Sequence, residues 1–430
     1  MRRTRFVAFS SVSMLLVAAS LLPQKSQTVP LLTPADGEAP NFSSRPPVIA
    51  PSGRVAAVAT EASNLVEGDA DTVRDILAIR LRKGLVSVAS VSSTGEKANG
   101  DSDDPALDRS GRHVAFASTA TNLVDGDVNG VQDIFLHDRR TATTVRVSVA
   151  SDGTEADGQS QQPWISSNGR LVVFASDATN LVEGDTNDRM DIFLHDMVSG
   201  ATQRVSQAFD GSEADADSFL PVLSGNGRWL AFLSEARNMV AIDGNASRDV
   251  FLRDLRTGAI EMVSVATDGS VSDGHSDRLS ISANGRRVAF DSRGQNLDPA
   301  DQHVGLDVFV RDRVKHTTKL MSLPADGAAA DGDSVQPALS ANGRWLAFSS
   351  AATNLVGGDG NLASDVFRMK LKTGAIERVS VSSVGLDADG NSVSPGLSRN
   401  GRYVVFSTRA TNLYPDAASN GTWSAALTRP

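Results

Sequence analysis

A Gly-Arg pair recurs along the chain at a constant interval of 58 residues, and this period constrains the fold more than any other feature. Relative to the glycine, a serine stands nine positions before it and an asparagine eleven positions after it in all seven copies. Identity at fixed offsets indicates a repeat architecture, in which each unit packs on its neighbours. The seven pairs are Gly53-Arg54, Gly111-Arg112, Gly169-Arg170, Gly227-Arg228, Gly285-Arg286, Gly343-Arg344 and Gly401-Arg402.

Each unit contains four short apolar runs separated by turn sequences, and none of the runs has a helical period. The second run is apolar at consecutive positions, which indicates a strand that is buried on both faces. A four-stranded sheet packed between two similar sheets is a propeller blade. The repeat therefore predicts an all-β fold, a seven-bladed β-propeller of four-stranded antiparallel blades. In the third unit the predicted strands are Pro163 to Ser166, Leu171 to Ser176, Asp191 to His195 and Thr202 to Ser206.

The two ends of the repeat region predict how the ring closes. The last unit has strands at Pro395 to Leu397 and Tyr403 to Thr408 and a weak third around Trp423 to Leu427, but its fourth is missing. Val29 to Thr33 lie at the offset that an outer strand occupies before the next Gly-Arg pair. Because an open sheet edge would leave backbone groups unpaired, we expect this N-terminal strand to close the last blade.

The first twenty residues predict a signal peptide. Arg2, Arg3 and Arg5 precede an apolar run from Phe6 to Leu22 that ends in small residues suited to cleavage. The alternative is an uncleaved membrane anchor, but the run is short and interrupted by serine. We therefore expect residues 1–20 to be a signal peptide and residues 21–430 to be a single propeller domain, secreted or periplasmic, with no membrane insertion after cleavage.

The net charge and the cysteine content exclude several kinds of partner and site. The chain has 41 Lys and Arg against 51 Asp and Glu, a net charge of -10, which argues against nucleic acid as a partner. It has no cysteine, which excludes disulfide bonds, thiolate metal sites and a cysteine nucleophile. Stability must come from burial and hydrogen bonding.

The unit P-x-I-S-x-N-G-R-x-V-A-F-x-S, followed by a loop and D-[IV]-F-x-x-D, resembles the TolB-like (WD40-like) propeller repeat of periplasmic proteins. The resemblance covers almost the whole mature chain, and it implies a propeller fold. For function it implies a binding scaffold or, in a few relatives, a hydrolase or lyase. TolB itself has six blades and a separate N-terminal domain, so this chain departs from it. One copy carries the motif on Pro337, Ser340, Asn342, Gly343, Arg344, Phe348, Asp365 and Phe367.

The loop after the second strand carries a D-x-[ND]-x-x-x-D pattern in five units, a variant of it in the fifth unit, and no such pattern in the last unit. Its oxygen atoms suit a hard cation such as Ca²⁺. The alternative is structural, because Asp and Asn stabilise tight loops through their own backbone. The final Asp would also face a serine of the second strand and form a short hydrogen bond with it, as Asp191 would with Ser176 and Asp365 with Ser350. In the fifth unit His303 takes the middle position, between Asp301 and Asp307. The candidate calcium ligands are Asp69, Asp71, Asp75, Asp127, Asn129, Asp133, Asp185, Asn187, Asp191, Asp243, Asn245, Asp249, Asp359, Asn361 and Asp365.

Blade topology predicts two unlike faces. The loop after the second strand and the loop between units should emerge together and form an acidic face, while the Gly-Arg turns should form a face richer in arginine. Each arginine of the repeat should pair with an aspartate at the end of the third strand. These aspartates are Asp138, Asp196, Asp254 and Asp312.

No residue set in the sequence predicts catalysis. The six histidines form no H-x-x-x-H pair, and no Gly-x-Ser-x-Gly elbow is present. We expect a monomeric, non-enzymatic scaffold that binds a protein or a cell-envelope component. The alternative is a secreted propeller enzyme, a hydrolase or lyase acting on polysaccharide or peptide. If the residues that break the repeat cluster in space, a dedicated site is favoured; if they are scattered, a scaffold is favoured. These residues include Trp164, His275, Arg278 and His303.

Overall fold

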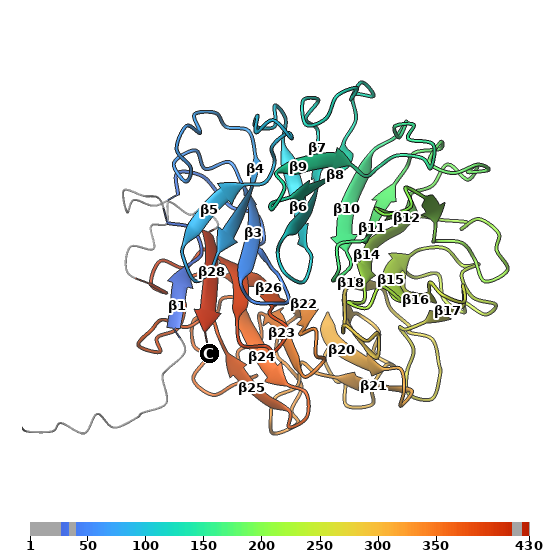
Figure 1. The fold of residues 1–430 in the computed structure, drawn as a ribbon. Coiled ribbons are helices and arrows are strands. Elements are labelled where there is room, and N and C mark those ends of the chain that lie inside the picture. Colours follow the sequence, from blue (N-terminus) through green and yellow to red (C-terminus); the bar gives the residue numbers. More distant parts are fainter. Residues whose placement is uncertain (1–26, 34–39, 415–423, 430) are drawn as a thin grey trace, which may run out of the picture.

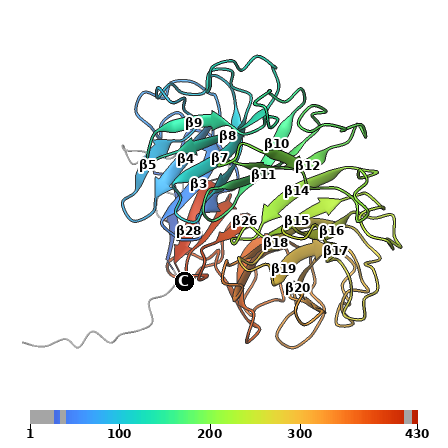
Figure 2. The same cartoon turned by 45° about the vertical axis from the view of Figure 1, so that its right-hand side comes forward.

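The strands form seven four-stranded antiparallel sheets arranged as blades around a central axis (Figures 1 and 2). The computed structural model describes residues 27–33, 40–414 and 424–429. Within them every regular element is a strand. The predicted seven-bladed β-propeller is therefore confirmed. The predicted signal peptide, residues 1–20, lies outside the described residues and stays a prediction.

The blades follow one another in chain order, and each begins with its innermost strand. The first blade contains β2 (Val48–Ile49), β3 (Val55–Thr60), β4 (Asp75–Arg80) and β5 (Leu85–Val88). The second contains β6 (Ser102–Leu107), β7 (His113–Ser118), β8 (Asp133–Asp138) and β9 (Thr143–Arg146). The third contains β10 (Ser160–Ile165), β11 (Leu171–Ser176), β12 (Asp191–Asp196) and β13 (Thr202–Arg204). The fourth contains β14 (Ser218–Leu223), β15 (Trp229–Ser234), β16 (Asp249–Asp254) and β17 (Ile260–Met262).

The remaining blades repeat this order. The fifth contains β18 (Ser276–Ile281), β19 (Arg287–Ser292), β20 (Asp307–Asp312) and β21 (Thr317–Leu320). The sixth contains β22 (Ser334–Leu339), β23 (Trp345–Ser350), β24 (Asp365–Lys370) and β25 (Ala375–Arg378). The seventh contains β26 (Ser392–Leu397), β27 (Val404–Thr408), β28 (Ser424–Arg429) and, as its outer strand, β1 (Gln27–Pro30).

The ring closes through the N-terminal strand, as predicted. Strand β1 pairs antiparallel with β28, so that Val29 lies opposite Leu427, and Figure 1 shows the two strands side by side. The strand begins at Gln27, two residues before the predicted start at Val29. This pairing joins the two ends of the chain in one sheet and leaves the seventh blade with four strands like the others.

The core lies between neighbouring blades and is built from the second and third strands. In the third blade Phe174 of β11 and Phe193 of β12 are fully buried, with ring centroids 5.9 Å apart, and four other blades have the same pair. Burial of such side chains contributes roughly 1.5–3 kcal/mol each. The consecutive apolar residues of the second strand are therefore explained by contact with a sheet on either side.

The repeated glycine is required by the contact between blades. Gly285 has φ of +72°, which disfavours any residue with a Cβ, and an added Cβ would lie 2.1 Å from Cδ1 of Trp229 in the preceding blade. In five of the seven turns an asparagine precedes this glycine, and its Oδ1 accepts the backbone N–H of the arginine two residues on, as Asn342 does from Arg344 at 2.9 Å. The Asn-Gly-Arg sequence is therefore a close-packed turn that holds adjacent blades together.

Candidate functional site

The two ends of the propeller carry different connections. We call the surface formed by the loops after the second strands and by the loops between blades the loop face. We call the surface formed by the Gly-Arg turns the turn face. The two loop types do meet, because Arg146 Nη1 lies 3.3 Å from Asp127 of one loop and 2.7 Å from Glu155 of the other. This confirms that they share one face.

In the third blade, the last aspartate of the loop is held from two sides. Asp191 is fully buried, and its Oδ1 accepts a hydrogen bond from the Ser206 hydroxyl, while its Oδ2 accepts one from Asn187 Nδ2 at 3.0 Å. Burial raises the pKa of Asp191, and these hydrogen bonds oppose that rise. Asn187 therefore stabilises the carboxylate as a donor.

The predicted hydrogen bond between this aspartate and the second strand was wrong. Ser176 does lie opposite Asp191 in the register, but its hydroxyl donates to the Gln159 carbonyl at 2.9 Å and accepts a bond from Ser160 at 3.0 Å. The same holds in the sixth blade. Ser350 donates to the carbonyl of Asp333, which precedes the innermost strand, and Asp365 accepts a hydrogen bond from the Ser380 hydroxyl. The hydroxyl of the second-strand serine already bonds groups at the innermost strand, so the aspartate accepts its hydrogen bond from a serine that follows the outermost strand.

A cation of the chain itself lies among the carboxylates of this loop. Arg204 Nη1 is 2.9 Å from Asp185, 3.3 Å from Asp191 and 2.6 Å from Glu213, and the arginine side chain is only 7% exposed. Arg146 in the second blade and Arg378 in the sixth occupy the same place. These arginines stand 35 positions after the repeated glycine, an offset that the sequence analysis did not use.

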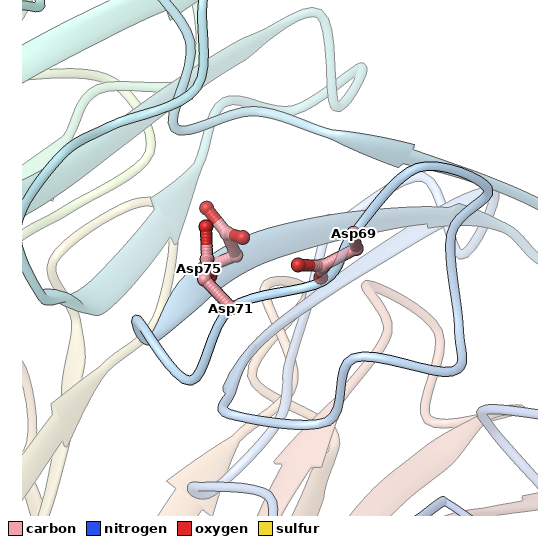
Figure 3. Close-up of side chains that lie close together, drawn as sticks. All are labelled: Asp69, Asp71 and Asp75. Carbon is pink, nitrogen blue, oxygen red and sulfur yellow. The ribbon is translucent and has the colours of Figure 1, made fainter.

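The first blade also has a cation among these carboxylates, but Val88 stands at the arginine position and the cation comes from the position of the acid. Lys97 stands where the second blade has Glu155, and its Nζ lies 2.6 Å from Asp69, 3.3 Å from Asp71 and 2.9 Å from Asp75. Figure 3 shows these three carboxylates, whose oxygen atoms lie within 4.8 Å of one another as in a possible metal site. Burial disfavours the charged ammonium, but its contacts with Asp69 and Asp75 outweigh this effect and raise the pKa of Lys97.

The fourth and fifth blades depart from this arrangement. In the fifth, His303 Nδ1 lies 2.8 Å from Asp307 Oδ2. In the fourth, Met262 and Val271 replace the cation and the acid, and no ion pair within the described residues reaches Asp243 or Asp249. Burial raises the pKa of Asp249 to about 7.

The turn face carries the predicted arginine–aspartate pairs. Arg170 Nη2 lies 2.6 Å from Asp196 Oδ2, and Arg228 and Arg286 make the same contact with the aspartates of their own blades at 2.7 and 2.8 Å. The arginine lowers the pKa of Asp196, because it stabilises the ionised carboxylate. The Arg170 side chain is 52% exposed, so this pair contributes little to stability.

In the sixth blade the pairing aspartate is replaced by Lys370, and a basic cavity of about 570 Å³ opens between the fifth and sixth blades. Arg344, Lys370 and Lys372 make no ion pair with any described residue, whereas Arg286 is paired with Asp312. The sequence analysis missed this cavity, although Lys370 at an aspartate position was a visible signal. The lining residues are Ser282, Asn284, Arg286, Arg287, Asn342, Gly343, Arg344, Lys370 and Lys372.

The innermost strands line the central channel. Side-chain oxygens accept hydrogen bonds from backbone N–H groups of the next blade's innermost strand. Gln162 Oε1 accepts from Leu220 N at 2.8 Å, and Gln336 Oε1 accepts from Ser394 N at 2.9 Å. In the fifth blade the buried Asp291 takes this role, accepting at 2.7 Å from Gln336 N. The side chains that reach these backbone groups therefore tie the blades together around the axis.

The four residues that break the repeat do not form a common site. Trp164 on β10 is 39% exposed, and Arg278 on β18 is exposed as well. His275 Nδ1 accepts the backbone N–H of Arg248 at 2.9 Å, and His303 pairs with an aspartate of its own loop. Within the described residues no hydrogen bond or ion pair joins any two of the four, and the two equivalent histidines, His137 and His195, are buried against threonines.

No helix in residues 27–33, 40–414 and 424–429 has the length and apolarity to span a membrane. No protein-family model and no curated protein matches the chain.

Solved structures give the remaining comparison. An oligogalacturonate lyase from Vibrio parahaemolyticus has a TM-score of 0.55 and 10% identity over 94% of this chain and 97% of its own. The β-propeller domain of the trilobed protease from Pyrococcus furiosus has a TM-score of 0.54 and 11% identity over 90% and 96% of the two chains. An oligogalacturonate lyase in complex with manganese has a TM-score of 0.54 and 11% identity over 94% and 98%.

TolB from Acinetobacter baumannii has 13% identity and a TM-score of 0.41 over 78% of this chain, which spans 63% of the TolB chain. At such identities these likenesses concern the fold and not the activity. The resemblance of the repeat to TolB-like propellers is confirmed at the level of the β-propeller fold.

Proposed function

We propose that this protein is an extracytoplasmic, non-enzymatic binding scaffold whose turn face holds an anionic group of a partner protein or of another cell-envelope component. The observation that carries the proposal is the cavity of about 570 Å³ on the turn face, lined by Arg344, Lys370 and Lys372 without a matching carboxylate of their own. In the second to fifth blades an aspartate of the same blade neutralises the repeated arginine. The first blade has Arg80 at this position, and the seventh likewise has no aspartate there. The missing anion is therefore expected to come from a ligand.

The use of the other repeated polar residues supports a scaffold. In the first, second, third and sixth blades the loop-face carboxylates bind a cation of the chain itself, and in the second to fifth blades the repeated arginines bind aspartates. No hydrogen bond or ion pair within the described residues joins the residues that break the repeat. Groups that are saturated by structural partners are poorly placed for acid–base or nucleophilic chemistry. We propose calcium binding for one loop, that of the fourth blade.

The test is a pull-down of the mature protein from an envelope extract, compared with Lys370→Asp, which gives the sixth blade the aspartate that the second to fifth blades have at this position. We expect the native protein to retain a partner that salt releases, and Lys370→Asp to retain at least tenfold less. Lys319→Asp makes the same charge change on an exposed position of β21 and is the control. Equal capture by the Lys370 and Lys319 variants would contradict the proposal.

A secreted propeller enzyme acting on polysaccharide or peptide is the second candidate, and one observation favours it. Trp164 is 39% exposed on the innermost strand of the third blade, and an accessible indole ring is a common platform for a sugar. Turnover of an acidic or neutral polysaccharide that is lost in Trp164→Ala but retained in Lys370→Asp would replace the scaffold proposal with this one.

A further inference from the structure

The position of the built-in cation on the loop face is defined by the blades that have one. A single nitrogen lies between the first and the last aspartate of the loop: Lys97 Nζ is 2.6 Å from Asp69 and 2.9 Å from Asp75 Oδ2. In the third blade the corresponding nitrogen of Arg204 lies 3.3 Å from Oδ2 of the last aspartate, and in the sixth that of Arg378 also lies at 3.3 Å. Oδ2 of the last aspartate therefore points toward the cation position.

The fourth blade keeps the aspartates and lacks the cation. Asp249 has no exposed surface, its Oδ1 accepts from Ser264 at 2.6 Å, and its Oδ2 has no hydrogen-bond partner among the described residues. Met262 lies opposite Phe251 in the fourth blade, as Arg204 lies opposite Phe193 in the third. Met262 therefore stands at the arginine position. A buried ionised carboxylate without a partner is costly, and a cation would remove that cost.

We propose that the loop of the fourth blade binds Ca²⁺ between the carboxylates of Asp243 and Asp249. Asn245 supports the loop, because its Nδ2 donates to the Ser272 carbonyl at 2.7 Å and its Oδ1 accepts from Ser247 N at 3.1 Å. The inference is independent of the partner proposed for the turn face.

The donor set explains the choice of ion. All the candidate ligand atoms are oxygens, which suit a hard cation and disfavour zinc or copper. In the first, third and sixth blades the same position holds a nitrogen that lies 2.9 to 3.3 Å from Oδ2 of the last aspartate, so it is wide enough for Ca²⁺ and wide for the short metal–oxygen bonds of Mg²⁺. With only two charged ligands, the site belongs among weak extracellular calcium sites, with a Kd on the order of 10⁻⁴ to 10⁻³ M.

Calorimetric titration and thermal melting of the mature protein with CaCl₂ test the inference. We expect about one ion per chain at the affinity above, a melting temperature that rises with CaCl₂ and falls back with chelator, and a smaller rise with MgCl₂. Asp249→Asn should abolish the calcium response. Asp268→Asn removes an exposed carboxylate of the same repeat that bonds only its neighbour Ser270, and should leave the response unchanged.

A second variant keeps the test decisive if Asp249→Asn does not fold. Met262→Arg combined with Val271→Glu gives the fourth blade the residues of the third, so it should fold and lose the calcium response. Conversely, Arg204→Met combined with Glu213→Val gives the third blade the residues of the fourth and should raise the stoichiometry toward two ions. A calcium response that persists in the Met262 variant, or no response of the native protein at millimolar CaCl₂, overturns the proposal.

Discussion

The two faces of the propeller use the same pair of residue types in opposite surroundings. On the loop face Arg204 is 7% exposed and lies among three carboxylates, whereas on the turn face Arg170 is 52% exposed and binds one. The carboxylates respond accordingly, because burial raises the pKa of Asp191 while the arginine contact lowers the pKa of Asp196. Burial, and not the number of ion pairs, decides which of these contacts the fold depends on.

The comparison is tested most directly by making one substitution on both faces. Arg204→Met leaves Asp185, Asp191 and Glu213 without their cation, so we expect a loss of about 3–5 kcal/mol in the free energy of unfolding. Arg170→Met should cost at most about 1 kcal/mol, because its pair is screened by water. Urea unfolding followed by circular dichroism measures both, and equal losses would show that burial does not distinguish the faces.

A second test concerns backbone packing on the two faces. Gly285→Ala on the turn face combines a positive φ with a Cβ placed 2.1 Å from Trp229, and we expect a loss of roughly 2–4 kcal/mol. Gly153→Ala on the loop face has φ of +90° but no atom within 4 Å of the added Cβ, so it should lose only roughly 1–2 kcal/mol. Melting temperatures of the two variants give the comparison. If the Gly153 variant is the less stable one, the turns do not hold the blades together.

The third test uses pH and the channel wall between the two faces. Burial raises the pKa of Asp291 to about 6 from its usual 3.8. The folded state therefore binds a proton that the unfolded state has lost between these values, so the contribution of Asp291 to stability falls as pH rises from about 4 to 6, by about 1–3 kcal/mol. Asp196, with a lowered pKa, contributes stability that is lost as pH falls.

The measurement compares the native protein with Asp291→Asn by urea unfolding between pH 4 and 7. The difference in unfolding free energy between the two proteins should change by that amount in favour of the variant as pH rises, and then level off above pH 6. A difference that stays constant over this range would show that Asp291 is ionised throughout.

Much of the fold could be predicted because the repeat makes each residue's environment recur. The offsets of the Gly-Arg pair located the strands, the closing strand and the pairs such as Arg170 with Asp196, all of which lie on adjacent strands or neighbouring turns. Contacts of this kind follow from strand register alone. The predicted bond from Ser176 to Asp191 failed because register fixes which residues face each other and not which of several hydroxyls the carboxylate accepts from.

The sequence by itself determined the number of blades, the closure and the two faces, because a period of 58 residues with four strand signals leaves few ways to pair the edges. Only the tertiary structure decided what the acidic loops hold. Lys97 reaches from one loop to the carboxylates of another, and Arg204 reaches carboxylates of two loops, in both cases through a long, flexible side chain. Whether such a charge is buried depends on how those loops fold against each other. For the same reason, the unpartnered carboxylate oxygen of Asp249 could be recognised only by comparison with Asp75, Asp191 and Asp365, each of which has a cation beside it.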